Sequence, residues 1–595
     1  MKPKTTAIWF ALAASLFAFI WIFNNYLQPR AVAVVGLLPG LRAADVAGIQ
    51  VSPAGATEIS AVRTDGAWLL QKPLAYPAQA AAVEALAGAL EKLVPASRLS
   101  ASDLRGHKNA DAEFGFDNPQ FSLAVAAGNQ RHQLMVGHRT APGDQVFVRV
   151  GGEDSVFVTD VGWLNLLPRT AADWRDTALV GAAGTCDWVV VTNGTKAMEF
   201  RRDPAGLAWR MVRPLQARAD NERIAAALQQ LRAARTVQFI TDDPRADLSS
   251  YGLQPADLAV WLGQGTNLAD GIEAGNAPPT NSTLLFARRA GWGAVVAANK
   301  DAFAGWRGGV NDYRDPHLFT PGTPPGEIEV RGENNFTLQQ HGSTNWDVAG
   351  ESFPADADNV QAFLKMLASL RVSEFVKDGN TATNIQEFGL VAPAHQITLR
   401  AAPGDTNAPL VQLLFGTVET NRVLVKRADE DFVYAITPAD YNSLFLFNDG
   451  WYYRDRRIWD FSETNVAQVT LRQSGKLRQL VRTGENKWSI AAGNGMINPP
   501  AVEETIHRLG QLTAAGWVGR NITEPEKYGL ATNNLAVTIE LKTGEKWQLD
   551  FGVELPQSQT ALAAVTYGAG RWAFVFPPVL YQFVANYLTI PANVP

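Results

Sequence analysis

Apolar residues recur at helical spacing in four separate segments of the chain. Steps of three and four residues place each set on one face of a helix, which predicts four helices that each cover a core. The four sets are Val83, Leu86, Leu90 and Leu93; Ile224, Leu228 and Leu231; Val360, Phe363, Leu367 and Leu370; and Val502, Ile506, Leu509 and Leu512. Asp220, Asp358 and Asn498 stand where an N-cap is expected.

Strand-like alternation surrounds each predicted helix. Two or three strands precede it, as in residues 336–350, which predict a hairpin through His341-Gly342-Ser343, and about four strands follow it. A second short helix is predicted at 161–168, 441–447 and 579–588. The pattern therefore predicts an α+β fold in which antiparallel strands form a sheet with helices on one face. Residues 263–282, rich in Gly, Asn, Ala and Pro, predict a surface loop.

Three markers show that this unit repeats about every 140 residues. The first is a tryptophan near the end of a strand-like run, at Trp68, Trp209, Trp346 and Trp488. The second is an aromatic-Gly-apolar triplet, at Phe114-Gly115-Phe116, Tyr251-Gly252-Leu253, Phe388-Gly389-Leu390 and Tyr528-Gly529-Leu530. The third is aromatic-Arg-Asp, at Trp174-Arg175-Asp176, Tyr313-Arg314-Asp315 and Tyr453-Arg454-Asp455.

The markers predict four tandem α+β repeats after an N-terminal segment. The predicted domains are 1–30 for a tail and membrane anchor, followed by repeats at 45–180, 186–318, 327–458 and 466–590. Linkers are expected near 180–186, 318–326 and 459–466.

The N-terminal segment predicts a single transmembrane helix. Residues 7–23 carry no charged side chain, and the span 5–27 would form about 34 Å of helix, enough for a hydrocarbon core of about 30 Å. Lys2 and Lys4 favour an N-terminus inside the cytoplasm. A cleaved signal peptide is the alternative, with a late site at Ala31-Val32-Ala33. Either case places the bulk of the chain outside the cytoplasm, and the expected location is the periplasmic side of the inner membrane.

Composition excludes several classes of protein. Of 595 residues, 46% are hydrophobic and 18% charged, which is unlike a disordered chain. The net charge of −6 argues against a nucleic-acid partner. One cysteine, Cys186, excludes an intrachain disulfide and a cysteine-based metal cluster.

Candidate chemical groups all have simpler structural interpretations. His132 and His138 share strand parity but lack a metal-binding motif, and Cys186 opens an apolar strand as a buried thiol. Asp356 and Asp358, with Glu351 before them, offer too few oxygens for calcium and suit helix capping. No catalytic, cofactor-binding or metal-binding residue is predicted, and no cofactor.

The repeated markers also favour structure over catalysis. The Arg-Asp pairs are interpreted as salt bridges at domain ends, with the Arg holding the Asp beneath an aromatic lid. The triplet aromatics are interpreted as core residues, with the glycine permitting a tight turn after the helix.

With these motifs, the chain resembles the bacterial "domain of unknown function 4340" family. The residues that carry the resemblance are Trp68 with Pro73, Trp209 with Pro214, and the triplets followed by Pro119, Pro255 and Pro393; the fourth triplet lacks that proline. Members are typically encoded with ABC-2-type exporter components and an auxiliary protein similar to those of gliding-motility transporters. The resemblance therefore implies an accessory subunit of an ABC-type export system, with other transporter subunits and the membrane as partners. It implies no catalytic residue.

Two functions from different classes follow. The first is a non-catalytic, membrane-anchored periplasmic scaffold or binding protein, and thus not an enzyme. The second is a cell-envelope enzyme acting on polysaccharide or peptidoglycan, in which exposed Trp163, Trp292 and Trp306 would stack on sugar rings.

Overall fold

The computed structural model describes residues 3–22, 36–181, 186–205, 208–351, 353–379, 381–530, 535–567 and 570–590, with side chains from residue 11 onward except that of residue 567. The chain forms two compact units, Met1–Asp315 and Pro316–Pro595. Each unit contains two β-sheets, and each of the four predicted repeat ranges contains one sheet.

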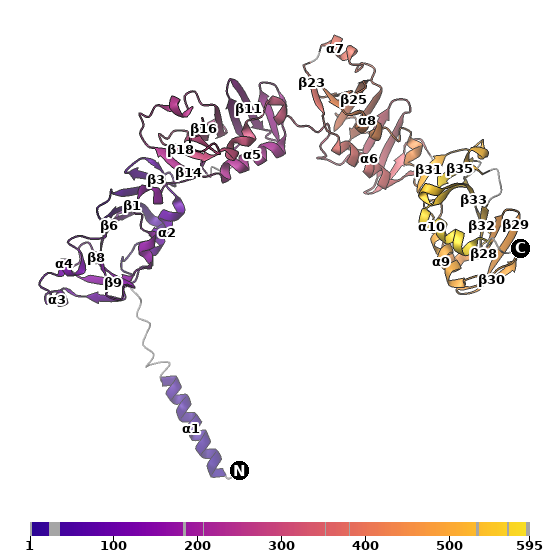
Figure 1. The fold of residues 1–595 in the computed structure, drawn as a ribbon. Helices are drawn as coiled ribbons and strands as arrows, with labels where there is room; N and C mark the ends of the chain where they lie inside the picture. Colours follow the sequence, from indigo (N-terminus) through magenta and orange to yellow (C-terminus); the bar gives the residue numbers. More distant parts are fainter. Residues whose placement is uncertain are drawn as a thin grey trace. The chain divides into compact units, whose positions relative to one another are not determined.

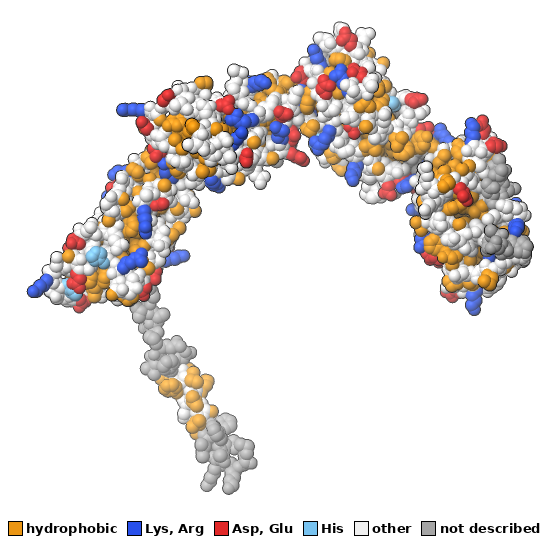
Figure 2. All heavy atoms as spheres, viewed as in Figure 1, with side chains coloured by type: hydrophobic (Ala, Val, Ile, Leu, Met, Phe, Trp, Pro, Cys, Tyr) orange, Lys and Arg blue, Asp and Glu red, His pale blue; other side chains and the backbone are white. Residues whose placement is uncertain are grey.

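The N-terminal helix α1 spans Pro3–Ile22. Its described side chains, from residue 11 to 22, are exposed and almost all hydrophobic (Figure 2). Within the described residues, no helix has both the length and the apolar character needed to cross a membrane. The last part of the predicted span, residues 23–27, lies outside the described residues.

The four sheets, whose strands are drawn as arrows in Figure 1, share one antiparallel strand order. In the first sheet, β4-β3-β2-β1 forms one meander, β1 pairs with β6, and β6-β7-β8-β9 forms a second meander that ends on β5. The other sheets repeat this order, and in the described residues the fourth lacks only the two-residue strand that corresponds to β4. We call each sheet, with the long helix that covers it, a module. The four similar sheets agree with the predicted α+β repeats.

The first unit holds modules 1 and 2. The strands of module 1 are β1 (Val46–Pro53), β2 (Ile59–Thr64), β3 (Ala67–Lys72), β4 (Tyr76–Pro77), β5 (Ser97–Leu99), β6 (Phe121–Ala127), β7 (Gln130–Arg139), β8 (Gln145–Val150) and β9 (Val156–Asp160). Its helices are η2 (Ala43–Asp45), α2 (Ala80–Glu91), α3 (Ala101–Leu104), α4 (Ala110–Phe114), η3 (Gly162–Leu166) and η4 (Ala171–Asp173). The strands of module 2 are β10 (Trp188–Asn193), β11 (Lys196–Arg202), β12 (Trp209–Arg213), β13 (Ala217–Arg218), β14 (Thr236–Thr241), β15 (Leu258–Gln264), β16 (Asn267–Ala274), β17 (Leu284–Arg289) and β18 (Val295–Asn299). Its helices are α5 (Asn221–Ala233), η5 (Leu248–Tyr251), η6 (Lys300–Trp306) and η7 (Val310–Tyr313).

The second unit holds modules 3 and 4. The strands of module 3 are β19 (Glu327–Arg331), β20 (Phe336–His341), β21 (Asn345–Val348), β22 (Pro354–Ala355), β23 (Glu374–Asp378), β24 (His395–Arg400), β25 (Val411–Val418), β26 (Val423–Arg427) and β27 (Phe432–Ile436). Its helices are α6 (Ala357–Ser369), α7 (Ala382–Glu387), α8 (Pro438–Leu444) and η8 (Gly450–Tyr453). The strands of module 4 are β28 (Val466–Gln473), β29 (Lys476–Gly484), β30 (Lys487–Ala492), β31 (Gly516–Gly519), β32 (Leu535–Leu541), β33 (Lys546–Leu555), β34 (Thr560–Tyr567) and β35 (Gly570–Val575). Its helices are η9 (Glu463–Asn465), α9 (Pro499–Gly510), η10 (Pro525–Tyr528), η11 (Pro556–Ser558), α10 (Pro578–Phe583) and η12 (Val584–Leu588).

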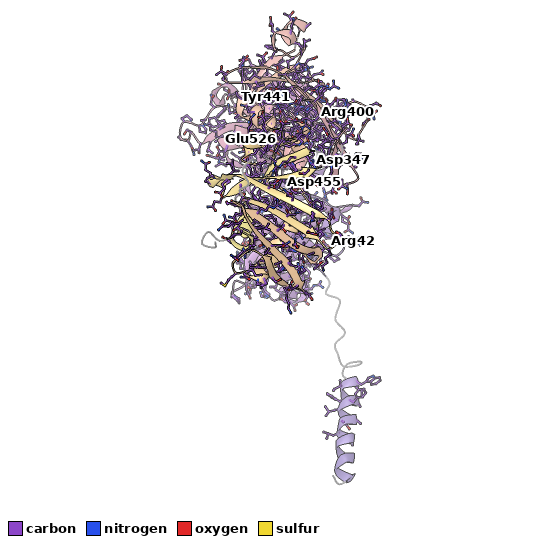
Figure 3. The ribbon with its side chains drawn as sticks, turned by 90° about the vertical axis from the view of Figure 1, so that its right-hand side faces the viewer. Arg42, Asp347, Arg400, Tyr441, Asp455 and Glu526 are labelled. Atoms are coloured by element: carbon purple, nitrogen blue, oxygen red, sulfur yellow. The ribbon has the colours of Figure 1, made fainter. Side chains whose placement is uncertain are left out.

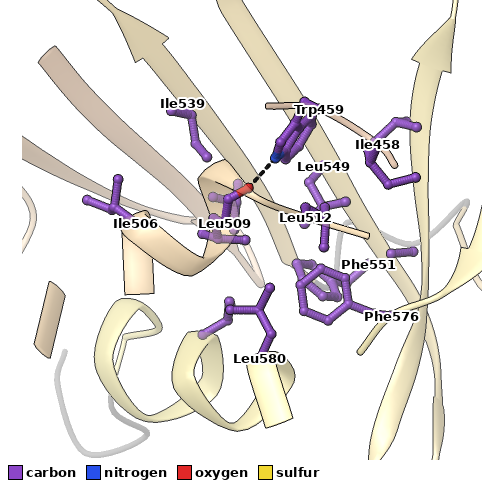
Figure 4. Close-up of a cluster of buried hydrophobic side chains, with 14 of the residues drawn as sticks. Ile458, Trp459, Ile506, Leu509, Leu512, Ile539, Leu549, Phe551, Phe576 and Leu580 are labelled. Atoms are coloured by element: carbon purple, nitrogen blue, oxygen red, sulfur yellow. Dashed lines mark hydrogen bonds between the residues drawn. The ribbon is translucent and has the colours of Figure 1, made fainter. Parts of the chain in front are cut away.

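The four predicted helices exist and bury the predicted faces. In α9, for example, Val502, Ile506 and Leu509 have no exposed surface and pack with the strands of module 4. Figure 4 shows Ile506 and Leu509 in this core. Asp220 and Asn498 cap α5 and α9 as expected, accepting hydrogen bonds from backbone amides. The cap of α6 is Asp356 and not Asp358, because the helix begins at residue 357 and Asp358 is already inside its first turn.

The marker tryptophans occupy equivalent positions, as predicted. Each lies on the third strand of its module and is almost completely buried, with exposed fractions of 3%, 3%, 2% and 5% for Trp68, Trp209, Trp346 and Trp488. In three modules an arginine on the neighbouring strand covers the indole ring. The guanidinium-to-ring distances are 5.9 Å for Arg63 on Trp68, 5.0 Å for Arg202 on Trp209 and 4.5 Å for Arg482 on Trp488.

The predicted linkers do not run free of the modules. Leu179 and Val180 pack in the core of module 2, and Ile458 and Trp459 pack in the core of module 4. The indole N–H of Trp459 donates to the backbone carbonyl of Leu509 at the end of α9 (Figure 4). The residues after the first and third Arg-Asp pairs are therefore part of the following core.

One other expectation was wrong, and one strand was missed. The range 263–282 is not one loop, because β16 occupies Asn267–Ala274 and pairs with both β15 and β17. Its small residues suit close strand pairing, and they concealed the strand from a hydrophobicity pattern. A further strand, such as β5, also follows each long helix and closes the far edge of the sheet. β5 has only three residues, Ser97–Leu99, and none of them is buried, so it carries little apolar signal.

The triplets hold a short helix against the second meander. Gly115, Gly252, Gly389 and Gly529 all have left-handed φ angles, from 67° to 82°. Each ends a short helix that the sequence pattern did not predict. The third residue is buried in every module, but Tyr251, Phe388 and Tyr528 are only half buried. The apolar third residue is thus the core residue, and the aromatic is so only at Phe114.

In each module, a second glycine that was missed in the sequence lies against the backbone of the triplet. The glycines are Gly137, Gly275, Gly416 and Gly552, and a Cβ at any of them would overlap the carbonyl oxygen of the triplet aromatic. Beside two of them, the backbone amides of Asn276 and Thr417 donate to these carbonyls at 2.9 Å. These glycines also recur about every 140 residues, which is the signal that could have revealed them.

Replacement of Gly416 by Ala is expected to lower the free energy of unfolding by about 1–3 kcal/mol, because the methyl group would force the strand away from the Phe388 carbonyl. Hydrogen exchange of the amides in β25 of the full chain measures the effect. Gly322→Ala is the control, since a Cβ there meets nothing within 4 Å. Equal stability of the two variants would show that the glycine contact is not required.

Candidate functional site

The third marker joins neighbouring modules and does not form the predicted internal salt bridge. Arg175 is 4% exposed, and its guanidinium binds Asp242 of module 2 at 2.7 and 3.1 Å. It also lies 4.6 Å from the Tyr76 ring and 3.5 Å from the Phe239 ring. The residue after it, Asp176, does not pair with Arg175. Arg175 therefore fills the junction between the edge strands β4 and β14.

The second unit repeats this arrangement with a different composition. Arg454 lies between aromatic rings of modules 3 and 4, at 3.8 Å from Trp572, 5.1 Å from Phe353 and 5.2 Å from Trp517. Asp455, labelled in Figure 3, accepts a hydrogen bond from the backbone amide of Arg457 at 3.0 Å. The arginine of the marker thus contacts the following module in both units.

Beside Arg175, charged residues form a network across the junction of modules 1 and 2. Arg289 of β17 binds Asp270 of β16 at 2.8 Å and Asp176 of module 1 at 3.2 Å. Asp270 also accepts from the backbone amides of Gly181 and Gly271. Arg288 binds Glu273 at 2.6 Å. Because each of these guanidinium groups faces at least one carboxylate, the network carries little net positive charge.

A groove of about 670 Å³ opens beside this network. Module 1 contributes residues of β3 and β4, and module 2 contributes residues of β15, β16 and β17 and the turn after β17. Trp261 and Trp292 are half-buried and line it. It is the candidate binding site of the first unit, because it combines a concave apolar surface with a few polar groups.

None of the three tryptophans expected to be exposed is fully exposed, and Trp292 is half-buried. Trp163 is 6% exposed and Trp306 has no exposed surface, so neither can stack on a ligand. Both lie on short helices that pack against the core, where an indole ring fills the space beside α2 or α5.

The weighed chemical groups are placed as structural residues. His132 and His138 lie on β7, where a change of register between Val136 and Arg139 interrupts the alternation on which their shared parity depended. Cys186 is 5% exposed and accepts a hydrogen bond from Arg232 at 3.4 Å. In the part of the chain that the structure describes, no group of three or more His, Cys, Asp or Glu residues could hold a metal ion.

The acidic residues before α6 have separate partners. Asp356 caps the helix, accepting from the amides of Asp358 and Asn359, and forms an ion pair with Arg456. Glu351 lies 3.9 Å from Arg520. These contacts agree with the predicted capping role for Asp356.

A cluster of one histidine and several aromatic residues in module 3 was missed in the sequence. The His395 ring stacks on Phe445 with 4.0 Å between centroids, and its Nδ1 lies 2.7 Å from the Tyr441 hydroxyl. Burial lowers the pKa of His395, and nearby Glu333 opposes this effect. Burial also raises the pKa of Tyr441, which is labelled in Figure 3. The packed aromatic neighbours come from β25 and the end of α8, so sequence periodicity alone did not reveal them.

The lowered pKa of His395 makes a pH dependence of stability predictable. Protonation favours the unfolded state, so the free energy of unfolding should fall as pH drops through about 6.5, by at most about 1.4 kcal/mol per pH unit. His395→Gln should flatten this dependence, whereas His341→Gln, at an exposed position 3.2 Å from Asp347, should leave it unchanged. Protection of the amides in β24 and β25 from hydrogen exchange, determined at several pH values, measures it. A dependence that survives in His395→Gln would contradict the assignment.

Comparison with known families agrees with the repeated architecture. The family described as "Domain of unknown function (DUF4340)" matches residues 68–200, 209–352 and 346–533. The chain belongs to the DUF4340 family. Each matched stretch begins at a marker tryptophan, namely Trp68, Trp209 and Trp346. No curated protein matches the chain.

The DUF4340 matches include the marker tryptophan and the triplet of the first three modules and extend to the triplet of the fourth. In the structure these residues pack the cores and attach the short helices. Membership in DUF4340 therefore corresponds to residues that build the modules, and it assigns no reaction to the chain.

Proposed function

We propose that this DUF4340 protein is a non-catalytic scaffold, held in the cytoplasmic membrane by its N-terminal segment, with its modules outside the cytoplasm. It would serve as an accessory subunit of an ABC-type export system. The observation that carries the proposal is that the recurring residues have structural roles. The marker tryptophans, triplets and arginines pack modules or join them, and repeated modules offer extended binding surfaces.

The membrane attachment has its own support. Leu12, Leu16, Phe17 and Ile20 of α1 are 52–72% exposed, and a surface of this kind is favourable in an apolar environment. The export system is supported by the resemblance to proteins encoded beside ABC-2-type exporters.

The topology is tested with a reporter that is active only in the oxidising compartment, fused after Pro595. Periplasmic activity is expected. Activity of a matched cytoplasmic reporter at the same position would overturn the proposed location and, with it, the export accessory.

Assembly is tested by pull-down of transporter subunits from solubilised membranes. Deletion of residues 1–27 behind a cleavable signal should weaken recovery, because the anchor confines the partners to one surface and raises their effective concentration. Cys186→Ser and Asp356→Asn should recover the subunits as the unaltered chain does, since the thiol is buried and asparagine can also cap α6. Loss of activity in either variant, with folding and assembly intact, would favour an enzyme.

A further inference from the structure

The groove between modules 1 and 2 has an aromatic surface on its module 2 side, formed by Trp261 and Trp292. Its walls include Trp68, Leu69 and Pro77 of module 1 and Trp261, Leu268 and Trp292 of module 2. Leu268 is 54% exposed, and the Trp292 ring lies 5.7 Å from the Tyr76 ring at the junction. The groove is therefore an apolar surface that remains open to solvent.

Trp261 is an addition to the module and not part of its core. It lies on β15 opposite Gly271 of β16. At the corresponding cross-strand positions, module 1 has Ala124 opposite Gln133, module 3 has Thr398 opposite Gln412, and module 4 has Thr538 opposite Gln548. Three modules thus form the same sheet without an aromatic residue there.

The glycine opposite Trp261 makes room for the indole ring. A Cβ at Gly271 would lie 2.6 Å from the Trp261 ring, so the glutamine of the other modules could not be accommodated in this position. The exchange places a half-buried indole ring at the surface, where it gains nothing for the core. The indole ring of Trp261 is therefore available for contact with a ligand.

The polar groups of the groove favour a ligand without net charge. Arg289 is held between Asp270 and Asp176, and Arg288 is paired with Glu273. A guanidinium has five N–H donors, and Glu273 accepts from the Nε and Nη2 groups of Arg288 through one oxygen, Oε2. The pair can therefore both donate and accept further hydrogen bonds.

We propose that this groove binds a neutral oligosaccharide. The apolar C–H face of a pyranose ring stacks on the indole rings of Trp261 and Trp292, since an indole offers a large rigid apolar surface. Hydroxyl groups act as donor and acceptor together, which matches the Arg288–Glu273 pair. This inference goes beyond the proposed scaffold and does not depend on it, because it concerns one groove and no transporter subunit.

The test is calorimetric titration of the detergent-solubilised full chain with cellohexaose, chitohexaose and maltohexaose. At least one should bind with a dissociation constant below about 1 mM, and Trp261→Thr should weaken it at least about tenfold. Threonine is chosen because modules 3 and 4 have it at this position. Affinity should be equal in about 0.05 M and about 0.5 M salt, since a neutral ligand is not subject to screening.

The matched control is Trp188→Thr. Trp188 is half-buried on β10 in the same sheet, but it does not line the groove. It should leave saccharide affinity unchanged, and thermal unfolding should show that both variants are folded. Absence of binding to all three saccharides, or equal loss in both variants, would overturn the proposal. Binding of a proline-rich decapeptide in place of the saccharides would also overturn it and identify the groove as a peptide site.

Discussion

Replacement of Trp209 by Ala should lower the local free energy of unfolding of module 2 by about 3–5 kcal/mol, the usual loss when a buried tryptophan is truncated. The Trp209 side chain is 3% exposed and belongs to the core that α5 covers. Its removal leaves a cavity and deprives Arg202 of the ring 5.0 Å away. Because the core is close-packed, the neighbouring side chains cannot fill that volume unless a strand moves.

Hydrogen exchange is the suitable measurement, because a chain of several modules does not unfold in one two-state step. Protection of the amides in β11 and β12 should fall by about two to four orders of magnitude. Trp188→Ala is the control, since this half-buried tryptophan lies outside the module 2 core cluster. Similar losses in the two variants would mean that Trp209 has no special role in the core.

Replacement of Arg175 by Ala should separate modules 1 and 2 energetically, at a cost of about 2–4 kcal/mol. The guanidinium is buried, binds both oxygens of Asp242 and lies against two aromatic rings. Asp242 is 40% exposed and can be rehydrated, so the loss should be below that of a fully buried pair. The void between Tyr76 and Phe239 accounts for the remainder.

Calorimetry of the full chain measures this coupling. We expect the transition of the first unit to split into two, because modules 1 and 2 would then unfold separately. Arg201→Ala is the control; Arg201 pairs with Glu199 at 2.7 Å, but its side chain is 54% exposed, and such pairs contribute about 0–1 kcal/mol. A single unchanged transition in Arg175→Ala would show that other contacts join the modules.

The repeated architecture was predictable because it depends on local pattern. The helix faces repeat at three and four residues, the marker tryptophans recur with them, and burial of one face is required of any helix on a sheet. The capping position of α6 was displaced by two residues, from Asp358 to Asp356, because both aspartates stand near the helix start. The strand β16 was missed because small residues that permit close pairing resemble a loop in composition.

The sequence by itself determined the α+β class, the four modules and the residues that pack them, since these follow from periodicity along the chain. Only the tertiary structure decided what the arginine of the third marker contacts, because its partners, Phe239 and Asp242, are more than sixty residues away in the next module. The groove, too, was decided only by the tertiary structure. Trp68 of module 1 and Trp292 of module 2 line one groove only because the two modules pack against each other, and contacts between distant segments leave no periodic signal along the chain.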